Sequence, residues 1–223
     1  MKKKSIVMLA TGIVLAASLV IGGTLAYFTD SKTAENTFTV GAGVSITLDE
    51  AKVKADGNGN YISDTDAARV QANTYENIAP GALLAKDPMI TNTSADPIYA
   101  RMKVTISNAA AWNAATDGAP NSILNIQEGW ELAATTPDAP NDTVTYTYNY
   151  TASTIAANGT ATLFTQVTIP NMTNAQMTAV GEGGFNITLV GEAIQANGFA
   201  DAAAAFAAID EALADNATTT PAA

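Results

Sequence analysis

Residues 100–106 read Ala-Arg-Met-Lys-Val-Thr-Ile, with apolar side chains at every even position and polar side chains between Ala100 and Ile106. This alternation is typical of a strand with one buried face, because successive side chains point to opposite faces of a sheet. It recurs over residues 38–48, 143–150 and 185–189. Roughly seven to nine such strands, separated by turns such as Asn158-Gly159, predict an all-β fold, a jelly-roll-like β-sandwich.

Two long segments, residues 49–79 and 107–142, lack this pattern. The second is interpreted as a long insertion with short helical turns, in which Trp112 and Trp130 dock on the edge of the core. The C-terminus changes to the three- and four-residue period of an amphipathic helix, which we expect to cover one end of the sandwich. Its apolar face consists of Phe199, Ala202, Ala203, Phe206, Ile209 and Leu213. The jelly-roll domain is expected to span residues 41–215, followed by a disordered tail over 216–223.

Composition excludes several classes of function. The 223 residues carry 10 Lys and Arg against 21 Asp and Glu, a formal net charge of -11. Phosphate binding needs clustered basic residues, so nucleic acid is not expected as a partner. The chain has no His and no Cys, which removes histidine bases, the Ser-His-Asp triad and thiolate metal sites. We therefore expect a non-enzymatic protein without a cofactor.

The N-terminus is typical of a secretory signal peptide. Three lysines, at positions 2–4, precede an uncharged run from Ser5 to Thr29. Small side chains at Thr24 and Ala26 suit cleavage after Ala26, so residues 1–26 are interpreted as the signal peptide. An uncleaved membrane anchor is the alternative, since the run is long enough to span a bilayer. The mature product is expected to be secreted or to lie on the cell surface.

Two patterns suggest binding sites, and each has a structural alternative. Oxygen ligands at the spacing of a calcium loop occur at Asp56, Asn58, Asn60 and Asp64, but position 6 is not Gly and position 12 is not Glu. A solvated turn is the favoured interpretation of this loop. The second pattern is a stripe of tyrosines at positions 146, 148 and 150, which would suit carbohydrate stacking. A buried strand face is the favoured interpretation of the stripe.

Several segments resemble the TasA/camelysin family of Gram-positive bacteria. They include the signal region Gly22–Asp30 and its continuation Asn36–Gly41, the central Ile78–Gly81, Ile90–Ser94 and Pro97–Arg101, and the closing Ala193–Phe199. The resemblance implies a jelly roll, export through a signal peptidase of the SipW type, and assembly into fibres of the biofilm matrix by donor-strand exchange. It also implies self-association, with other matrix proteins as further partners. Camelysins are described as surface metalloproteases, an activity that a chain without His and without the HExxH motif does not support.

Physical reasoning agrees with the assembly that this resemblance implies. An unpaired sheet edge exposes backbone donors and acceptors, which an extended segment from another chain can pair with. Residues 27–40 are the candidate donor strand, with Tyr27, Phe28, Phe38 and Val40 as the assembly residues. The first hypothesis is thus a secreted structural subunit of an extracellular fibre or pilus. A monomeric surface adhesin or carbohydrate-binding module is the alternative, and a camelysin-like surface metallopeptidase is the third hypothesis.

Overall fold

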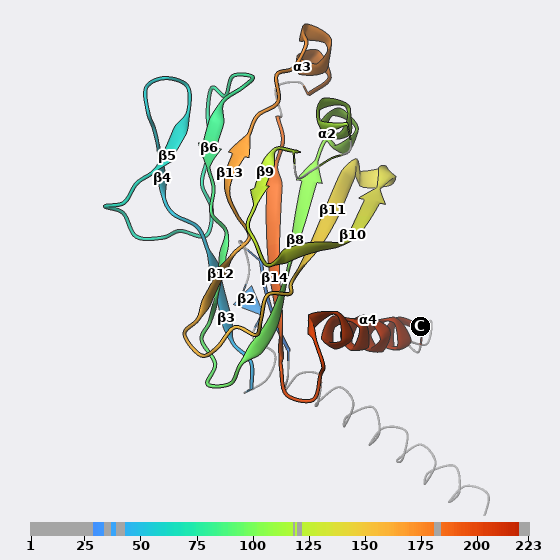
Figure 1. The fold of residues 1–223 in the computed structure, drawn as a ribbon. Helices are drawn as coiled ribbons and strands as arrows, with labels where there is room; N and C mark the ends of the chain where they lie inside the picture. The colour runs from blue at the N-terminus through green and yellow to red at the C-terminus, as the bar shows by residue number, and fades with distance from the viewer. Residues whose placement is uncertain are drawn as a thin grey trace, which may run out of the picture.

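A computed structural model describes residues 29–33, 37–38, 43–117, 119, 122–180 and 184–218. They form an all-β sandwich with few helices, which confirms the predicted fold class (Figure 1). A six-stranded sheet forms one layer, and a three-stranded and a five-stranded sheet form the other. The layers approach closely at Gly191, where an added Cβ would lie 3.3 Å from Ile90 and 3.6 Å from Ile46 of the opposite layer.

The large sheet is antiparallel throughout its described pairs. Its strands, in spatial order, are β10 (Trp130–Asp138), β11 (Thr143–Tyr150), β8 (Ile98–Ser107), β14 (Ile187–Gln195), β1 (Thr29–Thr33) and β2 (Thr37–Phe38). The ten-residue β8 lies near the middle of this sheet, between β11 and β14. Its alternation holds, because Ala100, Met102, Val104 and Ile106 are completely buried at 0% exposure.

The second layer is built from shorter strands. The three-stranded sheet contains β12 (Thr160–Thr162), β7 (Met89–Asn92) and β3 (Ile46–Asp49), in that order. The five-stranded sheet contains β4 (Val53–Ala55), β5 (Tyr61–Ser63), β6 (Leu83–Ala85), β13 (Phe164–Thr168) and β9 (Leu124–Ile126). Both sheets contribute to one hydrophobic core, which they share with β8, β11 and β14.

The alternation over residues 38–48 does not form one strand. Phe38 ends β2 in the large sheet, whereas Ile46 begins β3 in the opposite layer. A single strand and two strands of matching parity give the same alternating pattern, so periodicity alone could not separate them. Residues 39–42 lie outside the described ranges.

The two irregular segments contain more strand than the sequence predicts. Residues 49–79 include β4 and β5, and residues 107–142 contain β9, β10, helix α2 (Ala109–Thr116) and the 3-10 turn η2 (Ala139–Asn141). The docking of both tryptophans is confirmed. Trp112 donates from its ring nitrogen to the Tyr146 hydroxyl, and Trp130 donates to the Thr162 carbonyl. Each buried indole thus has the polar partner that it requires.

Helix α4 (Ala202–Thr218) covers part of the outer face of the large sheet, whereas the sequence predicted that it covers one end of the sandwich. Ala202, Ala205, Phe206 and Ile209 form its buried face over Ile194 of β14. Ala203, expected on this face, is exposed. The helix continues to Thr218, three residues into the expected tail, and residues 219–223 lie outside the described ranges. A shorter helix, α3 (Asn174–Val180), follows β13. Among the described helices none is long and apolar enough to cross a membrane.

Candidate functional site

The N-terminal strand β1 occupies a place in the chain's own sheet. It pairs with β14 over five residues, from Thr29 opposite Ile194 to Thr33 opposite Val190. The two-residue β2 then pairs back on β1, which places Phe38 opposite Ser31. Of the expected assembly residues, Phe38 therefore lies at the edge of the large sheet. Tyr27, Phe28, Val40, the Ala26 cleavage site and the signal peptide 1–26 lie outside the described residues.

Strand β14, which receives β1, is paired unequally on its two sides. Strand β8 pairs with all nine of its residues, from Ile187 to Gln195. Among the described residues, strand β1 pairs with Val190–Ile194. On the β1 side, no described residue pairs with Ile187–Leu189. Within the part of the chain that the structure describes, the first third of β14 thus has no partner strand on this side.

A charged cluster supports β14 from outside the sandwich. The Arg101 guanidinium on β8 is 3% exposed and donates from Nε to Glu192 of β14 and from Nη2 to Asp210 of α4, the latter at 2.7 Å. Its centre lies 4.6 Å from the Phe206 ring centroid, and Lys103 donates to Glu192 at 2.8 Å. Burial alone would lower the pKa of Arg101, but its hydrogen bonds to the two carboxylates raise it above its usual value. Arg101 therefore remains a cation that holds α4 against the sheet.

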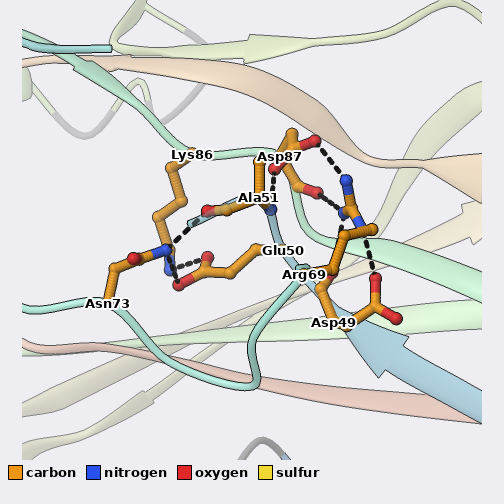
Figure 2. A network of polar contacts seen from close by, with 7 residues as sticks. All are labelled: Asp49, Glu50, Ala51, Arg69, Asn73, Lys86 and Asp87. Atoms are coloured by element: carbon orange, nitrogen blue, oxygen red, sulfur yellow. Dashed lines mark hydrogen bonds and ion pairs between the residues drawn. The ribbon is translucent and has the colours of Figure 1, made fainter. Parts of the chain in front are cut away.

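A second charged cluster lies in the other layer, where β3 ends (Figure 2). Glu50 is 1% exposed, and its carboxylate accepts from Lys86 Nζ at 2.5 Å and from Asn73 Nδ2 at 3.0 Å. Each oxygen of this buried carboxylate thus has a donor. The Lys86 ammonium balances the charge of Glu50, and the bond to Asn73 attaches that loop to the end of β3.

Arg69 extends this cluster toward the surface. Its Nε donates to Asp49 Oδ1 at 2.5 Å, and its Nη1 donates to Asp87 Oδ2 at 2.8 Å. The other oxygen of Asp87 accepts from the Ala51 amide at 2.6 Å. Burial opposes the charge of Arg69, but hydrogen bonds to Asp49 and Asp87 raise its pKa. The bonds cross 18 to 20 positions of sequence, and they hold the loop before Asn73 against the chain after β3.

A cavity of about 600 Å³ lies between the layers where β14 begins. Phe185 and Ile187 line it from the large sheet, together with Trp112 of α2. The Trp112 and Phe185 rings meet edge to face with centroids 5.4 Å apart. Leu84 and Lys86 line it from the opposite layer, and Lys86 is already paired with Glu50. The lining thus combines apolar rings with polar side chains such as Asn73, Asn77 and Asn186, and the charge of Lys86 is paired.

The candidate calcium residues form part of the β4–β5 hairpin. Asp56 Oδ1 accepts from the backbone amides of Asn58 and Asn60 at 2.7 and 3.1 Å, and Asp56 Oδ2 accepts from Asn60 Nδ2. These hydrogen bonds, led by the Asn60 side chain, lower the pKa of Asp56. Asp64 lies on the far side of the hairpin and pairs with Lys54 at 2.9 Å. The loop thus has the internal bonding of a turn, and calcium binding stays a prediction.

The tyrosine stripe is a buried strand face, as the favoured interpretation expected. Tyr146 and Tyr148 are 1% and 0% exposed, and burial raises the pKa of both hydroxyls. Tyr150 is half-buried, and its ring lies 5.2 Å from that of Trp130. A carbohydrate ring could not stack on Tyr146 or Tyr148 without opening the core, so the alternative of a sugar-stacking stripe is wrong for these two residues.

Both charged clusters escaped prediction because their partners are distant in sequence. Lys86 and Glu50 are 36 positions apart, and Arg101 and Asp210 are 109 apart. The only local signal was the position of Asp210 on the helix beside Phe206 and Ile209, which allowed it to face the sheet. Within the described part of the chain, no three acidic side chains gather closely enough to hold a metal ion.

Comparison with known proteins gives one match, at the N-terminus. Residues 1–59 match the family described as camelysin metallo-endopeptidase. No curated protein and no solved structure matches the chain. In the described ranges, the matched region includes β1 and β2 at the sheet edge, together with β3 and β4. It supports a secreted protein of the cell surface or matrix in general terms. The first 59 of the 223 residues thus carry the sequence pattern of the TasA/camelysin family, which confirms the resemblance in that region.

Proposed function

We propose that this chain is a secreted structural subunit that assembles head to tail into an extracellular fibre of the biofilm matrix. The observation that carries the proposal is the position of β1. Its described residues pair over five positions with the nine-residue β14, next to a two-residue β2. A strand of this kind can be exchanged for the same strand of another copy, because the identical backbone ladder re-forms.

We propose donor-strand exchange as the mode of this assembly. The segment from Tyr27 to Val40 leaves β14 of its own chain and pairs with β14 of the next chain. Gly41 and Gly43 give the connection to β3 the freedom that this movement requires. Donor and acceptor surfaces differ, so the contact is head to tail and propagates as a filament where the rotation does not close.

Export precedes assembly in this account. A signal peptidase of the SipW type removes residues 1–26, and the mature chain begins at Tyr27. The sandwich is proposed to be a jelly roll, as in the family that residues 1–59 resemble. Other matrix proteins are proposed as further partners of the fibre.

The peptidase hypothesis has one observation in its favour, the description of the matched family as a metallo-endopeptidase. The full chain lacks His and Cys, so it has no HExxH motif and no histidine base. We therefore propose a non-enzymatic role. The purified mature chain should leave casein intact, and casein cleavage that a chelator abolishes and that survives further purification would contradict this proposal.

Negative-stain electron microscopy of the mature chain tests assembly. A chain that begins at Tyr27 should form filaments, because its donor segment is free at the N-terminus. A chain that keeps residues 1–26 serves as the control, and filaments should be absent or short there. A mature chain that remains monomeric at every concentration would favour the monomeric adhesin.

A further inference from the structure

The unpaired part of β14 and the cavity lie at the same end of the sandwich. No described residue pairs with Ile187–Leu189 on the β1 side. Ile187, together with Phe185 just before it, lines the cavity of about 600 Å³. This volume lies within the range of roughly 300–1,000 Å³ that is typical of ligand pockets. An occupant that lengthened the β1 ladder would therefore meet the cavity.

The register of β1 identifies which residue would arrive there. Along this antiparallel ladder, each step forward on β1 is a step back on β14, from Thr29 opposite Ile194 to Thr33 opposite Val190. A straight continuation places residues 34–36 opposite Leu189–Ile187, and Phe38 opposite Phe185. Residues that stand opposite each other share a face of the sheet. Phe185 lines the cavity, so Phe38 would point into it.

Within one chain this does not happen. Strand β2 pairs back on β1, and Phe38 stands opposite Ser31 instead of Phe185. The last described pair between the chain's own segment and β14 is thus Thr33 with Val190. The segment of another copy can remain extended when it enters, because its connection to its own β3 leads away from the acceptor.

We propose that the cavity at the start of β14 receives Phe38 of a second copy of this chain, whose N-terminal segment lies along β14 as one unbroken strand. This inference rests on the proposed assembly function and adds to it the pocket that the donor fills. The rings of Trp112 and Phe185 and the side chain of Ile187 would surround the incoming phenyl ring. The open cavity of the monomer becomes the apolar contact of the fibre.

Engineered cysteines test the register, since the natural chain has none. Mature chains carrying Phe38→Cys are mixed with chains carrying Phe185→Cys, assembled and oxidised. Disulfide-linked dimers should appear on a non-reducing gel. The control mixes Thr33→Cys with Val190→Cys, which are neighbours in the observed ladder and should link between chains whenever a strand is exchanged. The double variant Phe38→Cys/Phe185→Cys is examined for a link within one chain.

The outcomes separate the two proposals. Disulfide links between chains at 33–190 and at 38–185 support strand exchange and the pocket. A link at 33–190 without one at 38–185 overturns the pocket and leaves strand exchange standing. Absence of both links between chains contradicts the assembly function itself. A 38–185 link that forms within single chains shows that the cavity takes its own chain's segment, which overturns the second copy as occupant.

A second measurement does not depend on removing the Phe38 ring. Ile187→Trp should fill the cavity and reduce filament yield by about tenfold or more, because the donor ring has no room. Thr188→Trp is the matched control, since Thr188 is exposed on the opposite face of the same strand. Its filament yield should stay near that of the unaltered chain. Equal yields from two folded variants would overturn the pocket.

Discussion

The two edges of the large sheet differ in how they could accept another strand. Strand β10 is nine residues long, and its residues between Trp130 and Asp138 are exposed. It carries an irregularity between Leu132 and Ala134, and Pro137, which has no amide hydrogen. Bulges and prolines are the devices by which natural sheets prevent edge-to-edge pairing. The opposite edge consists of the five-residue β1 and the two-residue β2. The long edge is thus protected, and the short edge is the one that we expect to exchange.

Deletion of residues 27–36 should reduce filament formation more than any other change. It removes β1 and leaves β14 unpaired along that edge, so a filament based on strand exchange has no donor. The truncated chain should keep a β-rich circular dichroism spectrum and form no filaments. Deletion of residues 219–223 is the control and should leave assembly unchanged. Normal filaments from the N-terminal truncation would place assembly elsewhere, for example at β10.

Phe38→Ala should weaken assembly without abolishing it. Complete burial of a phenylalanine side chain contributes roughly 1.5–3 kcal/mol, which corresponds to a rise of about tenfold or more in the critical concentration. Thr39→Ala is the control, because position 39 lies off the apolar face of the alternation. Sedimentation of filaments over a concentration series measures both. Identical critical concentrations for the Phe38→Ala and unaltered chains would show that Phe38 does not contribute to the contact between copies.

Helix α4 is held on the outer face of the large sheet through Asp210, which pairs with Arg101 of β8. The hydrogen bond from Arg101 holds the pKa of Asp210 below its usual 3.8. Since the folded pKa is depressed, this contribution to stability is present above about pH 4 and is lost as the pH falls through the lowered pKa. The Asp210 side chain is 57% exposed, so Asp210→Asn should lower the free energy of unfolding at pH 7 by only about 0.2–1 kcal/mol.

Urea denaturation of both chains at pH 7 and below pH 3 measures this effect. The difference between the chains should shrink as the pH falls, because protonation of Asp210 in the unaltered chain removes its ion pair with Arg101. Asp201→Asn would be unsuitable as a control, because Asp201 accepts from the Ala204 amide near the start of α4. Glu211→Gln is the better control, since Glu211 is exposed beside Asp210. A difference that stays constant with pH would contradict the role of the Asp210 charge.

Pro137→Thr should have the smallest effect on stability and on filament assembly. The site is exposed on β10, and surface substitutions usually change stability by no more than about 0.5 kcal/mol. Restoring an amide hydrogen there should leave ordered filaments unchanged, because they use the other edge. Light scattering would detect the disordered association that a less protected β10 permits. A strong change in filament structure would mean that β10 takes part in ordered assembly.

Alternation predicted the strands that have one buried and one outer face. This rule found β8 and β14, where Met102 and Leu189 face the core. It failed at β10, because residues 131–137 are exposed on both faces and leave no alternating signal. It also joined β2 to β3, since Phe38 and Ile46 have the same parity although they lie in different layers.

The candidate site was predictable only in part. The N-terminal segment could be identified from its position before the strands, but its partner β14 lies about 160 residues away and needs the folded chain. The cavity was not predictable at all. It arises where Phe185, Trp112 and Leu84 meet from three distant segments. No spacing of residues in the sequence predicts that these three segments come together.

The central claim is that β14 of one copy binds the N-terminal segment of another. A synthetic peptide of residues 27–40 tests this directly against the chain that lacks residues 27–36. The peptide should bind saturably with one site per chain in isothermal titration calorimetry, and it should cap filaments of the full mature chain. A scrambled peptide of the same composition should do neither. Absence of binding, or equal binding of the scrambled peptide, would contradict donor-strand exchange in this protein.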